Sequence, residues 1–419
     1  MAADKLRATH AVRSSLEHGR VIQAAAFATA PLAVVAPRAL AILLPLAAVT
    51  AFAAGLRAGV RPRIPAATSL LFTAFAVWAA ASGIWAEQPR LVWPALGQFA
   101  ATSVGGLALL SLVATLSADR RREIETALLA GVAIAWLLLA VEWVSGLIFE
   151  RSIAARFFVK EIYHGFIFNR GAAMLALLVW PAALAAARRH GPWAGVATVA
   201  AVAALLTQFE SMAALLGLAG GGFVALCALR WPLVTGRTFA MVLVAGALAA
   251  PWIVRIPMGE AVAARGDVSL SITHRIKIWR FVSDAIGERP AFGWGLNAAR
   301  ELPGRLTSDG AARMAPSAEE MSLHPHNAFL QIWLELGVVG AVMVCLLLAH
   351  ATRGARRLAA PGGGGGSEAA MALGGLGAAC LIAVTGYGIW QAWWLAGLWL
   401  AAAFIAVLAR CGDAQATAR

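Results

Sequence analysis

Long apolar runs separated by short polar segments recur along the whole chain. They fall at about residues 21–36, 39–56, 66–85, 93–116, 125–147, 169–187, 194–208, 212–229, 238–254, 327–349, 369–387 and 390–409. A helix needs about 20 apolar residues to cross a bilayer untilted, and several of these runs are shorter. Because 61% of the residues are hydrophobic and only 13% are charged, an ordinary soluble globular protein is excluded. We therefore predict an all-α, multi-pass membrane protein with about twelve transmembrane helices.

Basic residues in the short loops predict how these helices are oriented. If all twelve runs cross the membrane, five clusters of basic residues lie on the same side. The alternative is that the first two runs form one re-entrant hairpin. The clusters are Arg57, Arg61 and Arg63; Arg120, Arg121 and Arg122; Arg188 and Arg189; Arg230 and Arg237; and Arg353, Arg356 and Arg357. Short cytoplasmic loops are rich in Lys and Arg, so both termini are expected in the cytoplasm. The formal net charge of +13 then indicates contacts with anionic membrane lipids, and nothing in the sequence indicates nucleic-acid binding.

One large loop interrupts this pattern on the opposite side of the membrane. Residues 255–326 separate the ninth run from the tenth, so the expected parts are 1–254 with helices 1–9, the loop 255–326, and 327–419 with helices 10–12. Within the loop, residues 271–287 are predicted to form a helix at the membrane surface, because apolar residues recur at helical spacing. The apolar face consists of Ile276, Trp279, Val282 and Ile286.

Two histidines close this loop where the tenth run begins. Pro325 disfavours a helical backbone at His324, and Asn327 is a predicted N-cap, which places His326 just outside a helix. The positive end of the helix dipole disfavours an imidazolium, while free N–H groups there favour an anion such as phosphate. We therefore expect a neutral His326 that accepts a proton, and a capping role is the alternative. A metal site is not expected, because no third ligand has a recognisable spacing.

Arginines on the same side of the membrane are candidate ligands for an anion. Arg275 precedes Trp279 by one helical turn, so its guanidinium can stack on the indole and fork onto a phosphate. Arg170 opens the sixth run and must either extend to the membrane surface or face a polar cavity. Arg280 and Lys277 are weaker candidates. Simple pairing with lipid headgroups is the alternative for these basic residues.

Three segments resemble the superfamily of O-antigen ligases and O-antigen polymerases. They are FNRGAAMLALLVWP at residues 168–181, RIKIW at 275–279 followed by ERPAFGWGLN at 288–297, and the pattern formed by His326, Asn327, Gly337 and Gly340. The hydropathy layout agrees, so the resemblance covers nearly the whole chain. Independently of the resemblance, Gly337 and Gly340 are expected to serve close helix packing.

The resemblance implies a membrane glycosyltransferase of the bacterial inner membrane with an active site that faces the periplasm. An O-antigen ligase acts in lipopolysaccharide biosynthesis by moving a glycan from undecaprenyl pyrophosphate to a hydroxyl of lipid A-core. The resemblance assigns Arg170, Arg275 and Arg280 to the pyrophosphate and His326 to the acceptor proton, with no metal and no cofactor. Arg275 is thereby catalytic together with His326, and His324, Asn327 and Lys277 are further candidates for the site.

Two other functions are open on the sequence alone. A polymerase of O-antigen or exopolysaccharide would use the same donor with another glycan as acceptor. A transporter of lipid-linked glycans belongs to a different class, and it is expected to carry ionisable groups near the membrane midplane and broken helices in matching halves. Because the charges gather at one outer face and no repeated halves are visible, we expect transfer rather than transport, and a ligase rather than a polymerase.

Overall fold

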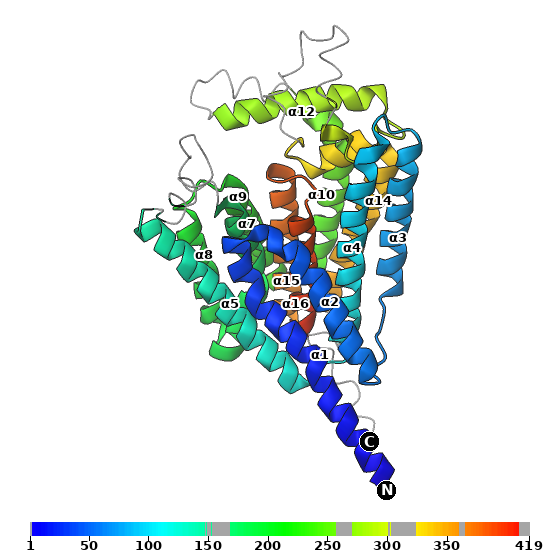
Figure 1. Ribbon diagram of the computed structural model, residues 1–419. Helices are drawn as coiled ribbons and strands as arrows, with labels where there is room; N and C mark the ends of the chain where they lie inside the picture. The colour runs from blue at the N-terminus through cyan, green and yellow to red at the C-terminus, as the bar shows by residue number, and fades with distance from the viewer. Residues whose placement is uncertain are drawn as a thin grey trace.

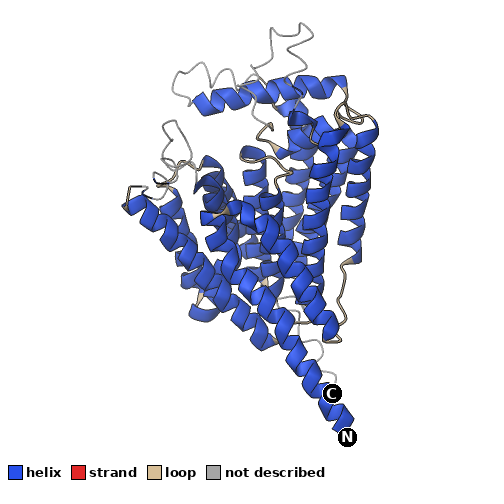
Figure 2. Ribbon diagram, viewed as in Figure 1, coloured by secondary structure: helices blue, strands red, loops and turns tan. Residues whose placement is uncertain are grey.

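The computed structural model describes residues 2–146, 168–256, 270–300, 324–359 and 365–409, with the single residues 148, 152 and 302. Every regular element in these residues is a helix (Figure 2), which confirms the predicted all-α class. Twelve α-helices coincide with the twelve apolar runs: α1 (Ala2–Val35), α2 (Leu40–Arg57), α3 (Ala66–Ala81), α4 (Pro89–Val113), α5 (Ala118–Val144), α7 (Asn169–His190), α8 (Pro192–Leu206), α9 (Met212–Arg230), α10 (Pro232–Ile253), α14 (Ala328–Arg357), α15 (Gly366–Thr385) and α16 (Ala392–Leu408). Short 3-10 helices are η1 (Pro37–Ala39), η2 (Ser82–Ile84) and η4 (Ala298–Arg300).

The helices of this bundle have the length and composition of membrane spans. Nine of those in the described residues are long and apolar enough to cross a bilayer. The apolar helices α8 and α16 are shorter, with 15 and 17 residues, and α1 is not among the nine. The helices α1 and α2, with 34 and 18 residues, are separate elements joined by η1. The chain is a multi-pass membrane protein, as predicted.

The helix α7 is the centre of the bundle. Residues 171–186 are all buried, which is expected for a helix that is apolar on every side. Small residues let neighbouring helices approach closely in a membrane protein. A Cβ on Gly171 would lie 2.9 Å from the Cα atom of Val34 in α1, and a Cβ on Gly374 in α15 would lie 2.9 Å from the ring of Trp180. Arg170 therefore lies in the first turn of the most enclosed helix.

The helix predicted in the large loop is α12 (Leu270–Glu288), and it lies across one end of the bundle (Figure 1). We call this end the α12 end. Its buried face is Ile278, Val282 and Ile286, whereas the predicted Ile276 is only half-buried. Because protein covers that face of α12, packing against the bundle contributes to its orientation. The membrane surface is therefore not needed as the sole cause. Large parts of residues 255–326 lie outside the described residues.

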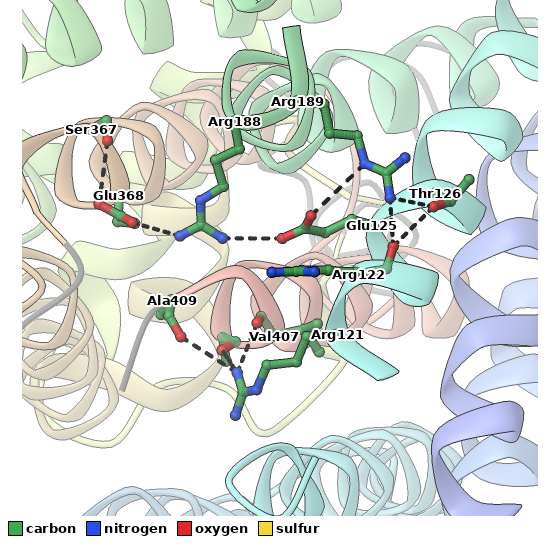
Figure 3. Close-up of polar contacts among 11 residues, drawn as sticks. Arg121, Arg122, Glu125, Thr126, Arg188, Arg189, Ser367, Glu368, Val407 and Ala409 are labelled. Atoms are coloured by element: carbon green, nitrogen blue, oxygen red, sulfur yellow. Dashed lines mark hydrogen bonds and ion pairs between the residues drawn. The ribbon is translucent and has the colours of Figure 1, made fainter. Parts of the chain in front are cut away.

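The opposite end of the bundle, which we call the basic end, carries arginines that are tied to other helices (Figure 3). Arg188 at the end of α7 lies between two carboxylates, 3.2 Å from Glu125 of α5 and 2.5 Å from Glu368 of α15. Arg121 donates to the carbonyl oxygen of Val407 in the last turn of α16 at 2.8 Å. These contacts join the ends of four helices, and a cation at a helix C-terminus is favourable.

The helix α14 is broken, although the sequence predicts a continuous span. Gly337 has φ 65° and ψ −163° and interrupts the helix. The loop after α12 inserts at the break, where the amides of Trp294 and Gly295 each donate to an α14 carbonyl at 2.9 Å. A Cβ on Gly337 would lie 2.2 Å from the carbonyl oxygen of Ala291. The expected role of Gly337 in helix packing is therefore wrong, because a positive φ and a close backbone approach require this glycine.

Candidate functional site

His326 lies at the α12 end, between Pro325 and the first residue of α14. Its φ of 51° is in the left-handed region, which few residues other than glycine adopt. The Nδ1 atom is 2.5 Å from the carbonyl oxygen of Gly386, in the segment between α15 and α16. A carbonyl oxygen can only accept, so Nδ1 carries the hydrogen, and the Nε2 atom of the neutral ring is left to accept a proton.

The surroundings of both histidines favour their neutral forms. Burial lowers the pKa of His326 from its usual 6.5, and the charges of Arg275 and His274 lower it further, against an opposing contribution from the Gly386 hydrogen bond. The ring of His324 lies 4.3 Å from that of His326, measured between centroids. Burial, the neighbouring His326 and nearby arginines lower the pKa of His324 to about 3. A neutral His326 agrees with the prediction, although burial rather than the helix dipole is the main cause.

Asn327 is the N-cap of α14, as predicted. Its Oδ1 atom accepts from the amides of Phe329 at 3.0 Å and Leu330 at 3.2 Å. These are the N–H groups that an anion at the helix N-terminus would use. The expectation that free N–H groups bind phosphate here is therefore wrong, because the asparagine already occupies them. Side chains must supply the positive charge for any anion at this site.

Two arginines from distant parts of the sequence converge beside these histidines. Arg170 of α7 and Arg275 of α12 are both half-buried, and both charges act on the phenol of Tyr387. The Cζ atom of Arg170 is 5.8 Å from the centroid of the Trp393 ring, which lies 4.8 Å from the ring of Tyr387. The charges of both arginines also act on His324. The structure thus brings together four of the predicted site residues: Arg170, Arg275, His324 and His326.

Neither of these guanidinium groups has an acidic partner within the described part of the chain. Among the residues that the structure describes, no ion pair or hydrogen bond engages Arg170 or Arg275. Burial lowers the pKa of Arg275 from its usual 12.5, but an arginine stays protonated in proteins. A half-buried charge without a counter-ion is unfavourable. The pair therefore forms a cationic site that an anionic ligand would complete.

The other basic candidates on α12 do not join this site in the same way. Lys277 is exposed. Arg280 follows Arg275 by five residues, which turns it about 140° around the helix, and it makes other contacts. The cation–π contacts among the described residues do not include Arg275 and Trp279, and the indole N–H of Trp279 donates to the carbonyl oxygen of Pro325 at 2.9 Å. The predicted cation–π pair is wrong, and the tryptophan instead ties α12 to the histidine segment.

Sequence reasoning missed the segment between α15 and α16, residues 386–391. It contributes Gly386, Tyr387 and Gln391, whose Nε2 atom is 3.3 Å from Nε2 of His324 and whose Oε1 atom accepts from Trp393 at 2.6 Å. Its sequence, GYGIWQ, contains the glycines, amide and aromatic residues of an interfacial turn. The predicted runs 369–387 and 390–409 included all of this segment except residues 388 and 389, so it was not recognised as a separate turn. No cluster of three or more His, Cys, Asp or Glu that could hold a metal occurs within the described residues.

Comparison with known proteins shows which family this chain resembles. Residues 195–345 match the model of the family described as O-antigen ligase, a stretch that includes Arg275 and His326 but not Arg170. A curated protein of Rickettsia felis with the provisional name polysaccharide ligase is 26% identical over 346 residues, which cover 80% of this chain and 78% of that protein.

Relatives in two further Rickettsia species carry the same provisional name. The protein of Rickettsia conorii is 26% identical over 293 residues, covering 67% of this chain and 66% of its own length. The protein of Rickettsia prowazekii is 26% identical over 287 residues, covering 66% of each chain. Together with the predicted motifs and the helical membrane fold, these matches support the predicted resemblance to the O-antigen ligase family.

Proposed function

We propose that the protein is a membrane glycosyltransferase that moves a glycan from undecaprenyl pyrophosphate to a hydroxyl of lipid A-core. The observation that carries the proposal is the pair Arg170 and Arg275, which have no acidic partner among the described residues and lie beside the neutral His326. The family and the names of the relatives support a polysaccharide ligase. The bound anion would be the pyrophosphate of the donor.

The same proposal places the α12 end in the periplasm of a bacterial inner membrane, with both termini in the cytoplasm. Support comes from the basic clusters of the short loops, which lie at the ends of α2, α5, α7, α9 and α14 (Figure 1). The polyprenyl tail of the donor would remain in the bilayer, and the glycan would lie in the aqueous phase. Arg280 is proposed as an outer contact for the donor and Lys277 as a contact for lipid headgroups.

In the proposed reaction, the acceptor oxygen attacks C1 of the donor sugar while the bond from C1 to the pyrophosphate oxygen breaks. The proton of the acceptor hydroxyl passes to Nε2 of His326, and the carbonyl oxygen of Gly386 stabilises the charge that develops at Nδ1–H. The leaving undecaprenyl pyrophosphate gains negative charge, which Arg170 and Arg275 bind. Planar guanidinium groups match the geometry of phosphate oxygens and take the role that a divalent cation has in many glycosyltransferases.

Deletion in the native bacterium tests the proposal and separates it from polymerisation, which breaks the same sugar–pyrophosphate bond. We expect lipopolysaccharide gels of the deletion strain to show uncapped lipid A-core, while polymerised glycan accumulates on undecaprenyl pyrophosphate. Restoring the wild-type chain should restore capping. Core that carries at most one repeat unit would contradict the ligase and indicate a polymerase, whereas unchanged lipopolysaccharide would contradict both.

A further inference from the structure

Glu335 is a fully buried carboxylate that the proposed reaction does not use. It lies in α14 two residues before the break at Gly337, with 0% of its surface exposed. One carboxyl oxygen accepts from the amide of Asn297 at 2.6 Å and from the indole N–H of Trp390 at 2.5 Å. The other accepts from Nε2 of Gln331 at 3.0 Å. All three partners are donors, which only an acceptor group can satisfy.

These hydrogen bonds join three segments that meet at the α12 end. Asn297 belongs to the loop after α12, Glu335 and Gln331 belong to α14, and Trp390 belongs to residues 386–391. Gln331 extends the network, because its Oε1 atom accepts from the amide of Ile389 at 3.0 Å. Two neighbouring residues of the 386–391 segment are therefore held, directly or through Gln331, by one buried carboxylate.

The same segment holds His326 in place. Gly386 accepts from Nδ1 of His326, and Gln391 contacts His324. Glu335 itself is nine residues from His326 along the chain, and the helical part of that distance alone spans about 10 Å. It is therefore placed to act through the segment rather than on the substrate.

We propose that Glu335 is a positioning residue that, through Gln331 and Trp390, fixes residues 386–391 so that Gly386 holds His326 with Nε2 free to accept the proton. The role of His326 rests on the proposed function, whereas the hydrogen bonds by which Glu335 holds residues 386–391 do not. Loss of an acceptor from a buried network leaves its donors unsatisfied, which costs more than an average hydrogen bond contributes. A shift of about 1 Å at His326 is enough to slow transfer on the order of a hundredfold.

Exchanging the carboxylate and the amide between positions 331 and 335 tests the network without changing its size or total charge, whereas Glu335→Gln alone removes the carboxylate. In Glu335→Gln, the new amide N–H group faces Gln331, so Gln331 must turn its own oxygen toward it and present N–H to the amide of Ile389. The side-chain N–H group of Gln331 and the backbone N–H group of Ile389, both donors, then face each other. In the double variant Gln331→Glu/Glu335→Gln, position 331 accepts both from position 335 and from Ile389, and position 335 still accepts from Asn297 and Trp390. Every donor regains an acceptor.

Two measurements on the purified full chain read out the effect. Hydrogen exchange of a peptide that covers residues 386–391 should accelerate in Glu335→Gln and return to the wild-type rate in the double variant. For transfer from an undecaprenyl-pyrophosphate-linked glycan, kcat should fall by on the order of 10- to 100-fold while the donor KM changes less than about threefold, and the swap should recover most of kcat. A merely structural role would not lower kcat while leaving the donor KM nearly unchanged, and the double variant would not then recover kcat.

Controls separate positioning from general destabilisation. Glu125→Gln removes a buried carboxylate at the basic end, and it should alter neither the exchange of residues 386–391 nor transfer per folded molecule. Trp390→Phe removes one donor, keeps an aromatic ring, and should lower kcat by a few fold even if Glu335→Gln does not fold.

The outcomes that overturn the inference are distinct from those that overturn the proposed function. A folded Glu335→Gln protein with wild-type exchange, or with faster exchange but wild-type kcat, would show that Glu335 does not position His326. A correctly folded double variant that stays inactive would do the same. If the wild-type chain transfers no glycan, the proposed function fails, while the exchange experiment still decides whether Glu335 clamps the segment.

Discussion

Arginines gather at both ends of the bundle, but their surroundings differ. At the basic end, Arg188 is held by Glu125 and Glu368, and Arg121 is held by carbonyl groups at the end of α16 (Figure 3). At the α12 end, Arg170 and Arg275 are half-buried without an acidic partner among the described residues. The number of arginines therefore does not identify a functional site in this protein. We propose that the lack of an acidic partner among the described residues marks the α12 end as the functional site, because a ligand would then neutralise the charge.

Replacing Arg275 should have the largest effect that distinguishes the two ends. Arg275→Ala is expected to slow transfer on the order of a hundredfold, and Arg275→Lys should be nearly as slow, since lysine keeps the charge but loses the planar fork. Donor binding and turnover, measured separately, would show which step fails. Arg188→Lys is the matched control and should leave transfer per folded molecule intact. Full activity of Arg275→Lys would indicate simple attraction to phosphate charge.

Replacing Arg188 should have the opposite profile. Arg188→Ala leaves Glu368, with 3% of its side chain exposed, without its cation. Breaking such a buried pair costs on the order of 3 kcal/mol of stability. Thermal unfolding in detergent should show this loss, while the transfer rate of the remaining folded protein stays close to the wild-type rate. A stable Arg188→Ala protein that has lost transfer would contradict the assignment of the basic end to structure.

The pH dependence of transfer is expected to differ from that of an exposed histidine. His326 must be neutral to accept a proton, and transfer is lost as the pH falls through its pKa. Burial and the charge of Arg275 lower this pKa from 6.5, so the acid limb of the pH–rate profile should lie below pH 6.5. Initial rates with saturating donor between about pH 5 and 8 test this. An acid limb at or above 6.5 would mean that His326 is not the titrating base, or that it is exposed.

The helices were predictable from sequence because membrane spans leave a strong local signal. Twelve apolar runs correspond to twelve helices, and the loop helix was expected within one residue of the observed α12 at each end. The break at Gly337 was not predicted, since it depends on the loop after α12 donating to α14 carbonyls. The hydrophobicity of a run does not predict a contact between that run and a distant loop.

The candidate site was only partly predictable for the same reason. Arg170 and His326 stand out as polar residues at or beside the start of apolar runs, and Arg275 stands out as a basic residue in the amphipathic helix of the large loop. Tyr387 and Glu335 gave no such signal, because each lies within a run predicted as a plain span. Tyr387 is affected by arginines of two other helices, and Glu335 accepts from Trp390, which lies 55 residues away. The stacking of Arg275 on Trp279 was predicted from spacing alone, and the structure instead turns Trp279 toward Pro325.

Transfer by the purified protein in liposomes, with wild type and His326→Ala compared in the presence of EDTA, tests the central claim most directly. The substrates are an undecaprenyl-pyrophosphate-linked glycan and lipid A-core. We predict that the wild type forms glycan-capped core and releases undecaprenyl pyrophosphate, whereas His326→Ala folds and binds the donor but forms product at least about a hundredfold more slowly. His190→Ala, at an exposed position at the end of α7, should match the wild type. Near-wild-type transfer by His326→Ala, or wild-type transfer that EDTA abolishes and magnesium restores, would contradict a reaction based on His326, Arg170 and Arg275.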